Sequence, residues 1–144
     1  MIRKAISGDE RILAEMAVRM WDSHTACELE KEFTETLKDE KTAFFIKYVN
    51  HNHVGFAQCG LRCDYVEGTE TSPVGYLEGI FVLPDYRNNG YAKELLSACE
   101  MWAKRMGCTE FASDCELDNI GSFKFHLAMG FDEANRIICF TKKI

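Results

Sequence analysis

The segment from Val74 to Asp114 constrains the fold of this chain more than any other part of the sequence. The apolar run from Val74 to Val82 predicts a buried strand, and a loop rich in asparagine follows it. A long amphipathic helix is expected from about Tyr91 to Met106, and a second strand from Thr109 to Ser113. Strands joined through a crossover helix run parallel, so the segment predicts two parallel strands within one sheet.

The flanking segments add antiparallel strands and further helices. Apolar runs on either side of a polar turn predict a hairpin with strands at Ala43–Val49 and Val54–Leu61. Ser7 and Glu10 have the spacing of a capping box, which predicts a helix from there to Trp21. The remaining elements are expected as a first strand at Met1–Ile6, helices at Cys27–Asp39 and near Gly121–Ala128, and a last strand at Ile137–Thr141. The expected fold class is α/β of the α+β kind, with a mixed, mostly antiparallel sheet and flanking helices.

Size, charge and cysteine content narrow the class of protein. A chain of 144 residues suits one domain, which we expect to span residues 1–144. The net charge of −6 argues against a nucleic-acid partner, and no apolar run reaches the ~20 residues that span a bilayer. The N-terminus lacks the apolar stretch of a secretion signal, which favours a cytoplasmic protein. Seven cysteines without a CxxC pair predict free, mostly buried thiols and no metal site.

The loop Arg87-Asn88-Asn89-Gly90-Tyr91-Ala92 has the features of an anion site at the start of a helix. Free N–H groups and the helix dipole favour an anion there, Gly90 permits close backbone approach, and Arg87 adds positive charge. The chain contains neither G-x-x-x-x-G-K-[ST] nor G-x-G-x-x-G, which argues against a nucleoside triphosphate or NAD. The alternative interpretation is a charged loop before an ordinary helix.

The stretch from Val82 to Ala92 resembles the pyrophosphate-binding motif of the GNAT acetyltransferases. Asn119, followed by His126 and Gly130-Phe131, resembles a later motif of the same superfamily. The resemblance implies that acetyl-CoA is the cosubstrate and that it enters between two parallel strands, which splay apart at their ends. It assigns contacts with acetyl-CoA to Ile80, Phe81, Val82, Asn88, Asn89, Gly90, Tyr91, Ala92, Lys93 and Asn119.

Longer strings resemble the aminoglycoside 6'-N-acetyltransferases: Ser72–Val82, Thr109–Asp114, and Met20-Trp21 with His24. This resemblance implies an enzyme that transfers an acetyl group to the 6'-amino group of a cationic aminoglycoside and so confers antibiotic resistance. It also implies a homodimer. The substrate-binding residues it assigns are Trp21, His24, Tyr65, Glu78 and Asp114.

Two carboxylates carry the expected chemistry. Glu78 lies inside an otherwise apolar strand, where an unpaired carboxylate is costly, so it needs either a salt-bridge partner or a function. Asp114 ends the next strand, where the alternative role is a turn or helix cap. The resemblance makes Asp114 the base that accepts a proton from the reacting ammonium. Glu78 then anchors a second ammonium or shares the role of the base.

Other candidate residues keep an alternative reading. His126 stands where GNAT enzymes often carry a tyrosine, so it is a candidate acid for the CoA thiolate, or else a polar residue facing the core. Trp21 is either a wall for the sugar or the end of an apolar helix stripe. Tyr65 lies in an acidic loop, which suits a lid. Asn135 replaces an acidic residue of some relatives, so it contributes no charge there.

Three other functions are compatible with the sequence. A GNAT enzyme could act on a different amine, such as a polyamine or a peptide N-terminus. The chain could bind CoA without catalysis, or it could be a small interaction domain that binds no CoA. The paired carboxylates favour an enzyme over a CoA-binding module without catalysis.

Overall fold

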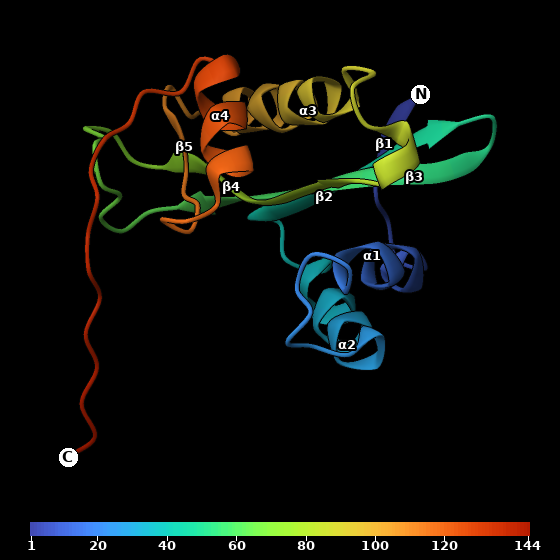
Figure 1. Ribbon diagram of the computed structural model, residues 1–144, viewed down its shortest axis with the longest axis horizontal. Helices are drawn as coiled ribbons and strands as arrows, with labels where there is room; N and C mark the ends of the chain where they lie inside the picture. The colour runs from blue at the N-terminus through green and yellow to red at the C-terminus, as the bar shows by residue number, and fades with distance from the viewer.

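The computed structural model describes residues 1–144 as a five-stranded sheet with helices on both faces (Figure 1). The strands are β1 (Ile2–Lys4), β2 (Thr42–Val49), β3 (Asn52–Arg62), β4 (Val74–Val82) and β5 (Phe111–Ser113). The helices are α1 (Glu10–Ala17), α2 (Ala26–Thr36), α3 (Tyr91–Arg105) and α4 (Ile120–Ala128), with a short 3₁₀ turn, η1 (Pro84–Tyr86). Strands lie side by side in chain order, antiparallel except for the parallel pair β4–β5. The predicted fold class, the hairpin and the parallel crossover are confirmed.

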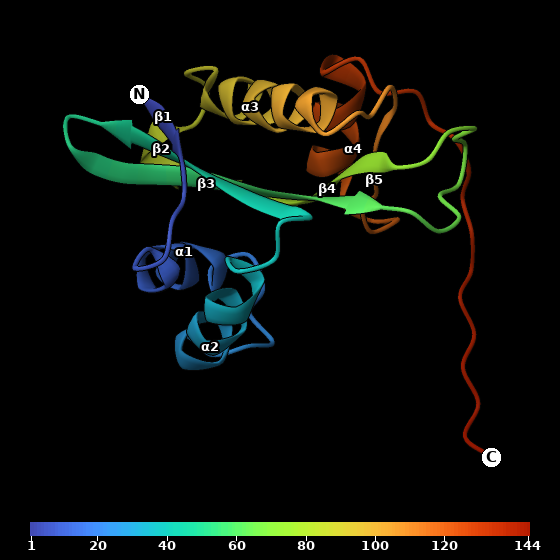
Figure 2. The same ribbon diagram turned by 180° about the vertical axis from the view of Figure 1, so that it is seen from behind.

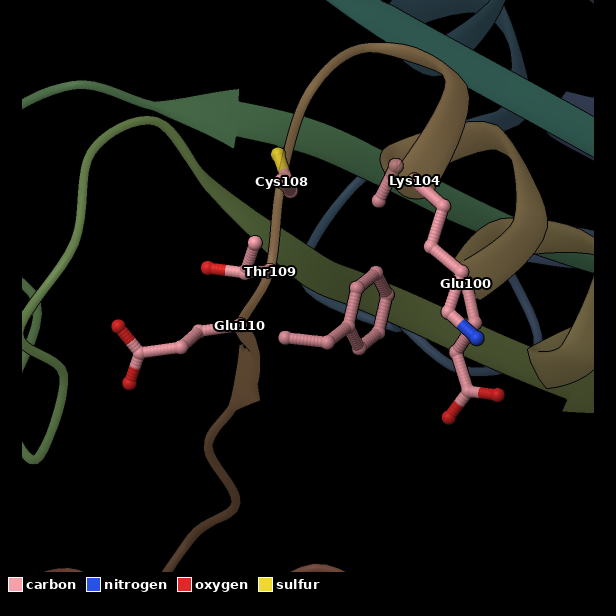
Figure 3. Close-up of a pocket in the computed structure, with 7 residues that line it drawn as sticks. Glu100, Lys104, Cys108, Thr109 and Glu110 are labelled. Carbon is pink, nitrogen blue, oxygen red and sulfur yellow. The ribbon is translucent and has the colours of Figure 1, made fainter.

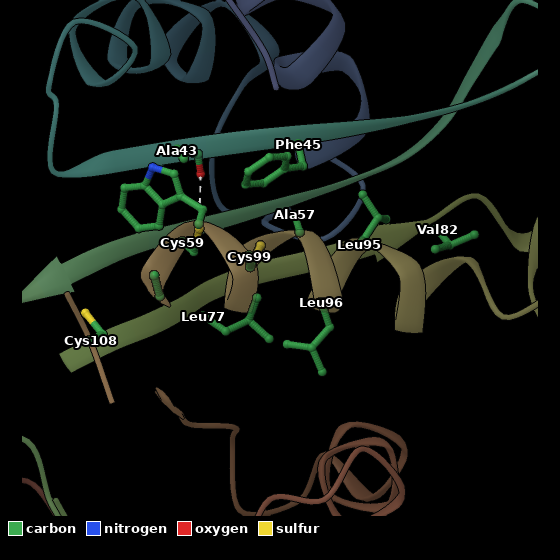
Figure 4. Close-up of a cluster of buried hydrophobic side chains, with 12 residues drawn as sticks. Ala43, Phe45, Ala57, Cys59, Leu77, Val82, Leu95, Leu96, Cys99 and Cys108 are labelled. Atoms are coloured by element: carbon green, nitrogen blue, oxygen red, sulfur yellow. Dashed lines mark hydrogen bonds between the residues drawn. The ribbon is translucent and has the colours of Figure 1, made fainter. Parts of the chain in front are cut away.

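Side chains alternate between the two faces of the sheet and form the main hydrophobic core on each face. Helices α1 and α2 cover one face, and α3 and α4 cover the other (Figures 1 and 2). On β2, Phe44 and Ile46 pack toward α1 and α2, whereas Ala43 and Phe45 pack toward α3. Figure 4 shows the second core, in which α3 contributes Leu95 and other buried side chains beneath the strands. Both faces of the central strands are therefore buried, which fixes their register.

The parallel contact between β4 and β5 is short. It consists of the pairs Gly75–Phe111, Tyr76–Ala112 and Leu77–Ser113, after which β5 ends while β4 continues to Val82. On its other side β4 carries a bulge. Gln58 of β3 faces Gly79 and Cys59 faces Leu77, so Glu78 has no partner in the ladder. The second half of β4 is thus open toward β5, as expected for splayed strands.

The N-terminal helix begins differently from the prediction. Its N-cap is Asp9, not Ser7. The Asp9 carboxylate does not cap the helix. It accepts hydrogen bonds from the Arg3 guanidinium at 2.7 and 2.8 Å and from the backbone N–H of Ile6 at 2.8 Å. The carboxylate pairs with Arg3 instead of capping the helix because Asp9 is buried and its charge needs a cationic partner. The helix also ends early, at Ala17, so Trp21 lies in the turn beyond it.

The expected last strand, Ile137–Thr141, does not form within this chain. Residues 131–144 contain no helix or strand, and the segment runs away from the body of the molecule (Figures 1 and 2). Ile137, Ile138 and Phe140 are 69%, 81% and 88% exposed. A strand needs an adjacent edge to pair with, and this segment does not pair with β5, the edge of the sheet.

The cysteines are free, but the expectation that most are buried is wrong. Cys59, Cys99 and Cys108 are buried, whereas the other four are exposed. Buried Cys59 donates a weak hydrogen bond to the carbonyl of Ala43 at 3.7 Å (Figure 4). None of the helices combines the length and the apolar character needed to cross a membrane.

We predict that Asp9→Asn lowers the free energy of unfolding by about 1–2 kcal/mol, because a charge-assisted hydrogen-bond pair with half-exposed Arg3 is weakened. The Arg3 guanidinium lowers the pKa of Asp9, so the stabilisation is fully present above the ordinary carboxylate pKa and is lost as the pH falls through the lower folded value. Urea denaturation of both proteins should show a difference at pH 7 that shrinks below about pH 4.

Glu15→Gln is the matched control, since it neutralises a carboxylate of the exposed pair with Arg11 on the same helix. It should change stability less than Asp9→Asn. Equal losses for the two variants would contradict a special role for the buried pair.

Candidate active site

Glu78 projects from the bulge of β4 and is held by an arginine. The Nη2 atom of Arg62, at the end of β3, lies 3.1 Å from both carboxylate oxygens of Glu78, and Nε lies 3.3 Å from one of them. The side chains are 43% and 32% exposed, so this ion pair lies at the surface of the sheet and not in the core. The salt bridge that sequence reasoning left open as an alternative is therefore present, in a half-exposed site that a ligand could reach.

Asp114 follows β5 directly, just past the last pair with β4. Its carboxylate accepts a hydrogen bond from the hydroxyl of Tyr76 on β4. Burial, together with the neighbouring carboxylate, raises the pKa of Tyr76 well above its usual range, so the phenol stays protonated and remains a donor. Sequence reasoning missed Tyr76, because an aromatic residue in an apolar strand is indistinguishable from a core residue.

A single chain of contacts connects the two carboxylates. The guanidinium of Arg62 pairs with Glu78 and also lies 3.3 Å from the centroid of the Tyr76 ring, whose hydroxyl bonds to Asp114. Residues far apart in the sequence thus meet where β4 and β5 separate. The structure brings the two predicted acidic residues into one network, and it adds Arg62 and Tyr76 to them.

Both ring nitrogens of His126 are occupied. Nδ1 lies 2.7 Å from the carbonyl oxygen of Ser122, which can only accept, so Nδ1 carries a proton. Nε2 lies 2.7 Å from the hydroxyl of Ser113, which also lies 3.3 Å from the carbonyl of Leu77. His126 is half-buried and packs against Phe131, with ring centroids 5.1 Å apart. It therefore reaches the opening between the strands through Ser113, a residue that the sequence did not single out.

Trp21 packs into the core and also borders β4 next to Glu78, and its role as a wall for the sugar stays a prediction. Its ring packs edge-on against Phe33 and Phe56, with centroids 6.4 and 6.3 Å away, so it closes the core beneath α1 and α2. It also lies against β4 beside Glu78. A Cβ on Gly79 would come within 2.7 Å of Trp21 Cζ2, so glycine is needed there for the indole to fit.

His24 and Tyr65 lie farther out. Both are exposed, and neither forms a hydrogen bond with Glu78 or Asp114. The Tyr65 hydroxyl donates to Glu67 at 2.6 Å within the acidic loop. Asn135 of the C-terminal segment also donates to Glu67, at 3.4 Å, which ties this segment to the loop.

The acidic loop is fastened at its base. The carboxylate of Glu110 accepts the backbone N–H groups of Glu70 and Thr71 at 2.9 and 2.7 Å. The hydroxyl of Thr71 donates to the same carboxylate, and this bond, together with the backbone bonds, lowers the pKa of Glu110, so the anchor keeps its charge. Figure 3 shows a shallow pocket beside this anchor, lined by Glu100, Lys104 and Cys108 among others, and none of the predicted site residues lines it.

The loop before α3 presents free backbone donors. Asn88 and Gly90 have φ of 63° and 77°, which turns successive N–H groups outward. The first helical bond is from Glu94 N–H to the Gly90 carbonyl, so the N–H groups from Asn88 to Lys93 have no acceptor within the chain. Together with the helix dipole they favour an anion such as a pyrophosphate.

Two cationic side chains stabilise this loop. Nε of Arg87 donates to the Val82 carbonyl at 3.0 Å, which folds the loop back onto the end of β4. Lys47, buried on β2, pairs with Glu94 and lies 4.4 Å from the centroid of the Tyr91 ring, which fixes the first turn of α3. Ile80, Phe81 and Val82 form the last part of β4 that leads into the loop.

Asn119 is the N-cap of α4. Its side chain accepts the backbone N–H of Ser122 at 3.1 Å, so the oxygen is used within the helix end. The amide N–H₂ group forms no hydrogen bond within the chain and remains available to a ligand. The predicted contact of Asn119 with acetyl-CoA stays a prediction.

Comparison with known proteins identifies the architecture. A model of the acetyltransferase (GNAT) family matches residues 12–131. The chain belongs to the GNAT acetyltransferase family. A curated relative, the aminoglycoside N(6')-acetyltransferase type 1 of Acinetobacter haemolyticus, is 41% identical over 130 residues, which cover 90% of this chain and 89% of that protein.

Solved structures agree with this result. The enzyme AAC(6')-Iy in complex with the bisubstrate analogue CoA-S-monomethyl-acetylneamine superposes with a TM-score of 0.95 at 36% identity, covering 100% of this chain and 98% of that one. The 6'-N-acetyltransferase AAC(6')-IG from Acinetobacter haemolyticus, without ligand, gives 0.94 at 38% identity, covering 100% and 99%. The resemblance to aminoglycoside 6'-N-acetyltransferases seen in the sequence is confirmed.

The GNAT cosubstrate, acetyl-CoA, fits the observed loop. The free donors from Asn88 to Lys93 match the pyrophosphate in charge, and the open half of β4 offers main-chain groups to its pantetheine arm. The structure thus combines the anion loop at the end of β4 with the two carboxylates near the point where β5 departs.

We predict that Gly90→Ala raises the KM for acetyl-CoA by about tenfold, an effect of about 1.4 kcal/mol. A side chain at a φ of 77° is strained, so the loop relaxes and its donors lose their alignment. Steady-state kinetics with varied acetyl-CoA measures the effect.

Gly107→Ala provides the control, because Gly107 closes the other end of α3 with a φ of 92° and has equally open surroundings. It should lose similar stability with an unchanged KM for acetyl-CoA. A similar rise of that KM in both variants would show that the effect comes from general strain in the helix.

Proposed function

We propose that this GNAT enzyme transfers the acetyl group of acetyl-CoA to the 6'-amino group of an aminoglycoside. The observation that carries the proposal is the pair Glu78 and Asp114, joined through Arg62 and Tyr76 where β4 and β5 part. Two carboxylates suit a substrate with several ammonium groups, and the relatives named above are enzymes for such substrates. Because acetyl-CoA is supplied inside the cell, we place the reaction in the cytoplasm.

Asp114 serves as the base in this proposal. A primary ammonium has a pKa near 10 and must lose a proton before its nitrogen attacks the thioester. Asp114 accepts that proton directly or through water, while the hydroxyl of Tyr76 holds the carboxylate in position. Glu78 binds a second ammonium of the substrate. Trp21 offers an aromatic surface beside Glu78 for a sugar ring, and the exposed side chains of Tyr65 and His24 are further candidates for contact with it.

His126 acts through Ser113 in the departure of CoA. When His126 is protonated, its Nε2–H donates to the hydroxyl of Ser113. The hydroxyl can pass its own proton to the thiolate and take the proton of His126 in the same movement. The carbonyl of Ser122 keeps Nδ1 protonated throughout, so the proton exchanged is always the one on Nε2.

An acetylation assay that detects released CoA thiol tests the function. Compounds of the kanamycin type with a 6'-amino group should be acetylated on that nitrogen, and analogues without it should not. In the same assay Asp114→Asn should lower kcat by about 10²–10⁴-fold, most strongly at low pH, where more of the amine is protonated. The KM for acetyl-CoA should not change.

Glu116→Gln is the matched control, because it removes an exposed carboxylate two residues along the chain whose side chain has no hydrogen bond. Acetylation of a polyamine or a peptide N-terminus, with aminoglycosides left untouched, would contradict the substrate class. Binding of acetyl-CoA in a thermal-shift experiment without turnover of any amine would contradict the enzymatic function.

We also propose that the protein is a homodimer in which the C-terminal segments are exchanged. The segment from Ile137 to Thr141 has the apolar pattern of a strand yet lies exposed, while β5 has an unpaired edge. Phe131 packs on Phe111 with centroids 6.3 Å apart, so the segment starts beside β5 before it leaves the body. A second copy supplies an identical open edge, and exchange of a strand between copies satisfies both.

Deletion of residues 137–144 should convert a dimer into a monomer, because the pairing strand is lost while the contacts of Ala134 and Asn135 with the acidic loop remain. Sedimentation equilibrium of the full chain and the shortened chain measures this. Deletion of residues 142–144 alone is the control and should leave a dimer. A monomeric full chain would mean that the segment folds back onto its own β5.

A further inference from the structure

The strongest unexplained feature of the site is a cation already bound to the substrate anchor. In this structure Arg62 occupies both oxygens of Glu78, the carboxylate that the proposed function assigns to a substrate ammonium. A carboxylate held by a bidentate guanidinium has few positions left for another cation. Arg62 and the substrate therefore compete for the same group.

We propose that Arg62 is a specificity-determining residue, an internal cation that holds the ammonium subsite of Glu78 until an aminoglycoside displaces it. The inference rests on the proposed function, and it assigns a role to a side chain that the mechanism does not use. A polycationic substrate reaches Glu78 only when one of its ammonium groups replaces the guanidinium.

The surroundings of Arg62 allow it to leave. Its side chain is 43% exposed and its ionic partner Glu78 is 32% exposed, although the ring of Tyr76 that it covers belongs to a buried residue. A half-exposed ion pair is only weakly held, since water screens it and two long side chains lose freedom in forming it. Arg62 lies at the last position of β3, opposite Val74, so its side chain can swing out into the acidic loop region without moving the strand.

Tyr76 gives Arg62 a second point of attachment that leads to the reacting side of the cleft. The guanidinium covers the ring whose hydroxyl bonds to Asp114. When Arg62 leaves, the ring face becomes available to the substrate, and a cation placed there gains the same attraction. Displacement of one side chain thus opens both the anchor and the aromatic surface beside the base.

This competition acts only on substrates that use Glu78. A molecule with several ammonium groups replaces Arg62 at Glu78 while another of its nitrogens lies near Asp114, so its binding includes the cost of displacing the guanidinium. A monoamine places its one nitrogen near Asp114 and leaves Arg62 in place, so it neither meets that cost nor gains the contact with Glu78. Arg62 therefore reduces the advantage of polycationic substrates over simple amines.

The test compares Arg62→Gln, Arg62→Lys and Arg11→Gln. The last variant removes a positive charge from the exposed pair on α1, far from the site in the chain, and is the control for net charge. For Arg62→Gln the KM for kanamycin should fall by about three- to tenfold, because the half-exposed ion pair with Glu78 no longer competes with the substrate ammonium. Arg62→Lys, which cannot form the planar two-point contact, should lie between. The KM for acetyl-CoA should stay constant in all three.

A second readout separates selection from a purely structural role. The ratio of kcat/KM for kanamycin to that for a monoamino sugar should rise in Arg62→Gln and remain at the wild-type value in Arg11→Gln. An unchanged or higher KM for kanamycin in Arg62→Gln, with an unchanged melting temperature, would overturn the proposal, since Arg62 would then orient Glu78 and not compete for it.

Calorimetric binding of kanamycin to wild type and Arg62→Gln is measured alongside the kinetics and needs no turnover. Tighter binding by the variant supports competition at Glu78 even if no acetylation occurs, which would sink only the proposed function. Equal binding by the two proteins overturns the role of Arg62 even if the wild type is an active aminoglycoside acetyltransferase.

Discussion

The short parallel contact between β4 and β5 is the constraint on which the rest of the site depends. Three residue pairs hold the strands together, from Gly75–Phe111 to Leu77–Ser113, and then hydrogen bonding between them stops. Because α3 connects the two strands over the same face, the anion loop is placed at the far end of the open stretch of β4. The anion loop and the two carboxylates are arranged around this separation, and they would not face a common opening if the pairing continued to Val82.

The bulge in β4 adds a second constraint at the same point. A regular ladder alternates side chains between faces, but the extra residue at Glu78 interrupts the alternation and leaves a partly exposed carboxylate without a ladder partner in an otherwise apolar strand. Arg62 neutralises the carboxylate of Glu78 in the free protein. Tyr76 stabilises the carboxylate of Asp114 by donating a hydrogen bond to it. The two carboxylates can therefore remain charged before a cationic substrate binds. Each has a partner in the free protein, so the free-energy cost of desolvating it is modest.

The parts of the fold that sequence reasoning predicted are those set by local pattern. The run Val74–Val82, the loop through Gly90 and the helix after it carry their own signals of strand, turn and helix start, and the crossover rule supplies the parallel pairing. The prediction of Ser7 as the cap is wrong. The helix begins after Asp9, and the position of Asp9 depends on its contact with Arg3 of β1, which no local pattern shows. Tyr76, Ser113 and Arg62 escaped notice for the same reason. Each acts through a partner remote in the chain, 38, 13 and 16 residues away in the bonds to Asp114, His126 and Glu78.

The C-terminal segment links the proposed dimer to the substrate side of the molecule. Before it leaves the body it passes the acidic loop, where a Cβ on Gly68 would lie 2.6 Å from the Cβ of Ala134 and where Asn135 bonds to Glu67. Glu67 is also the partner of the Tyr65 hydroxyl. A strand that pairs with the β5 edge of a second copy fixes the path of the preceding residues, because an extended chain has little slack over so few positions. Exchange of the segments would therefore hold the acidic loop in one position, and with it Tyr65, the proposed substrate contact, so that assembly of the proposed dimer would also order this side of the substrate site.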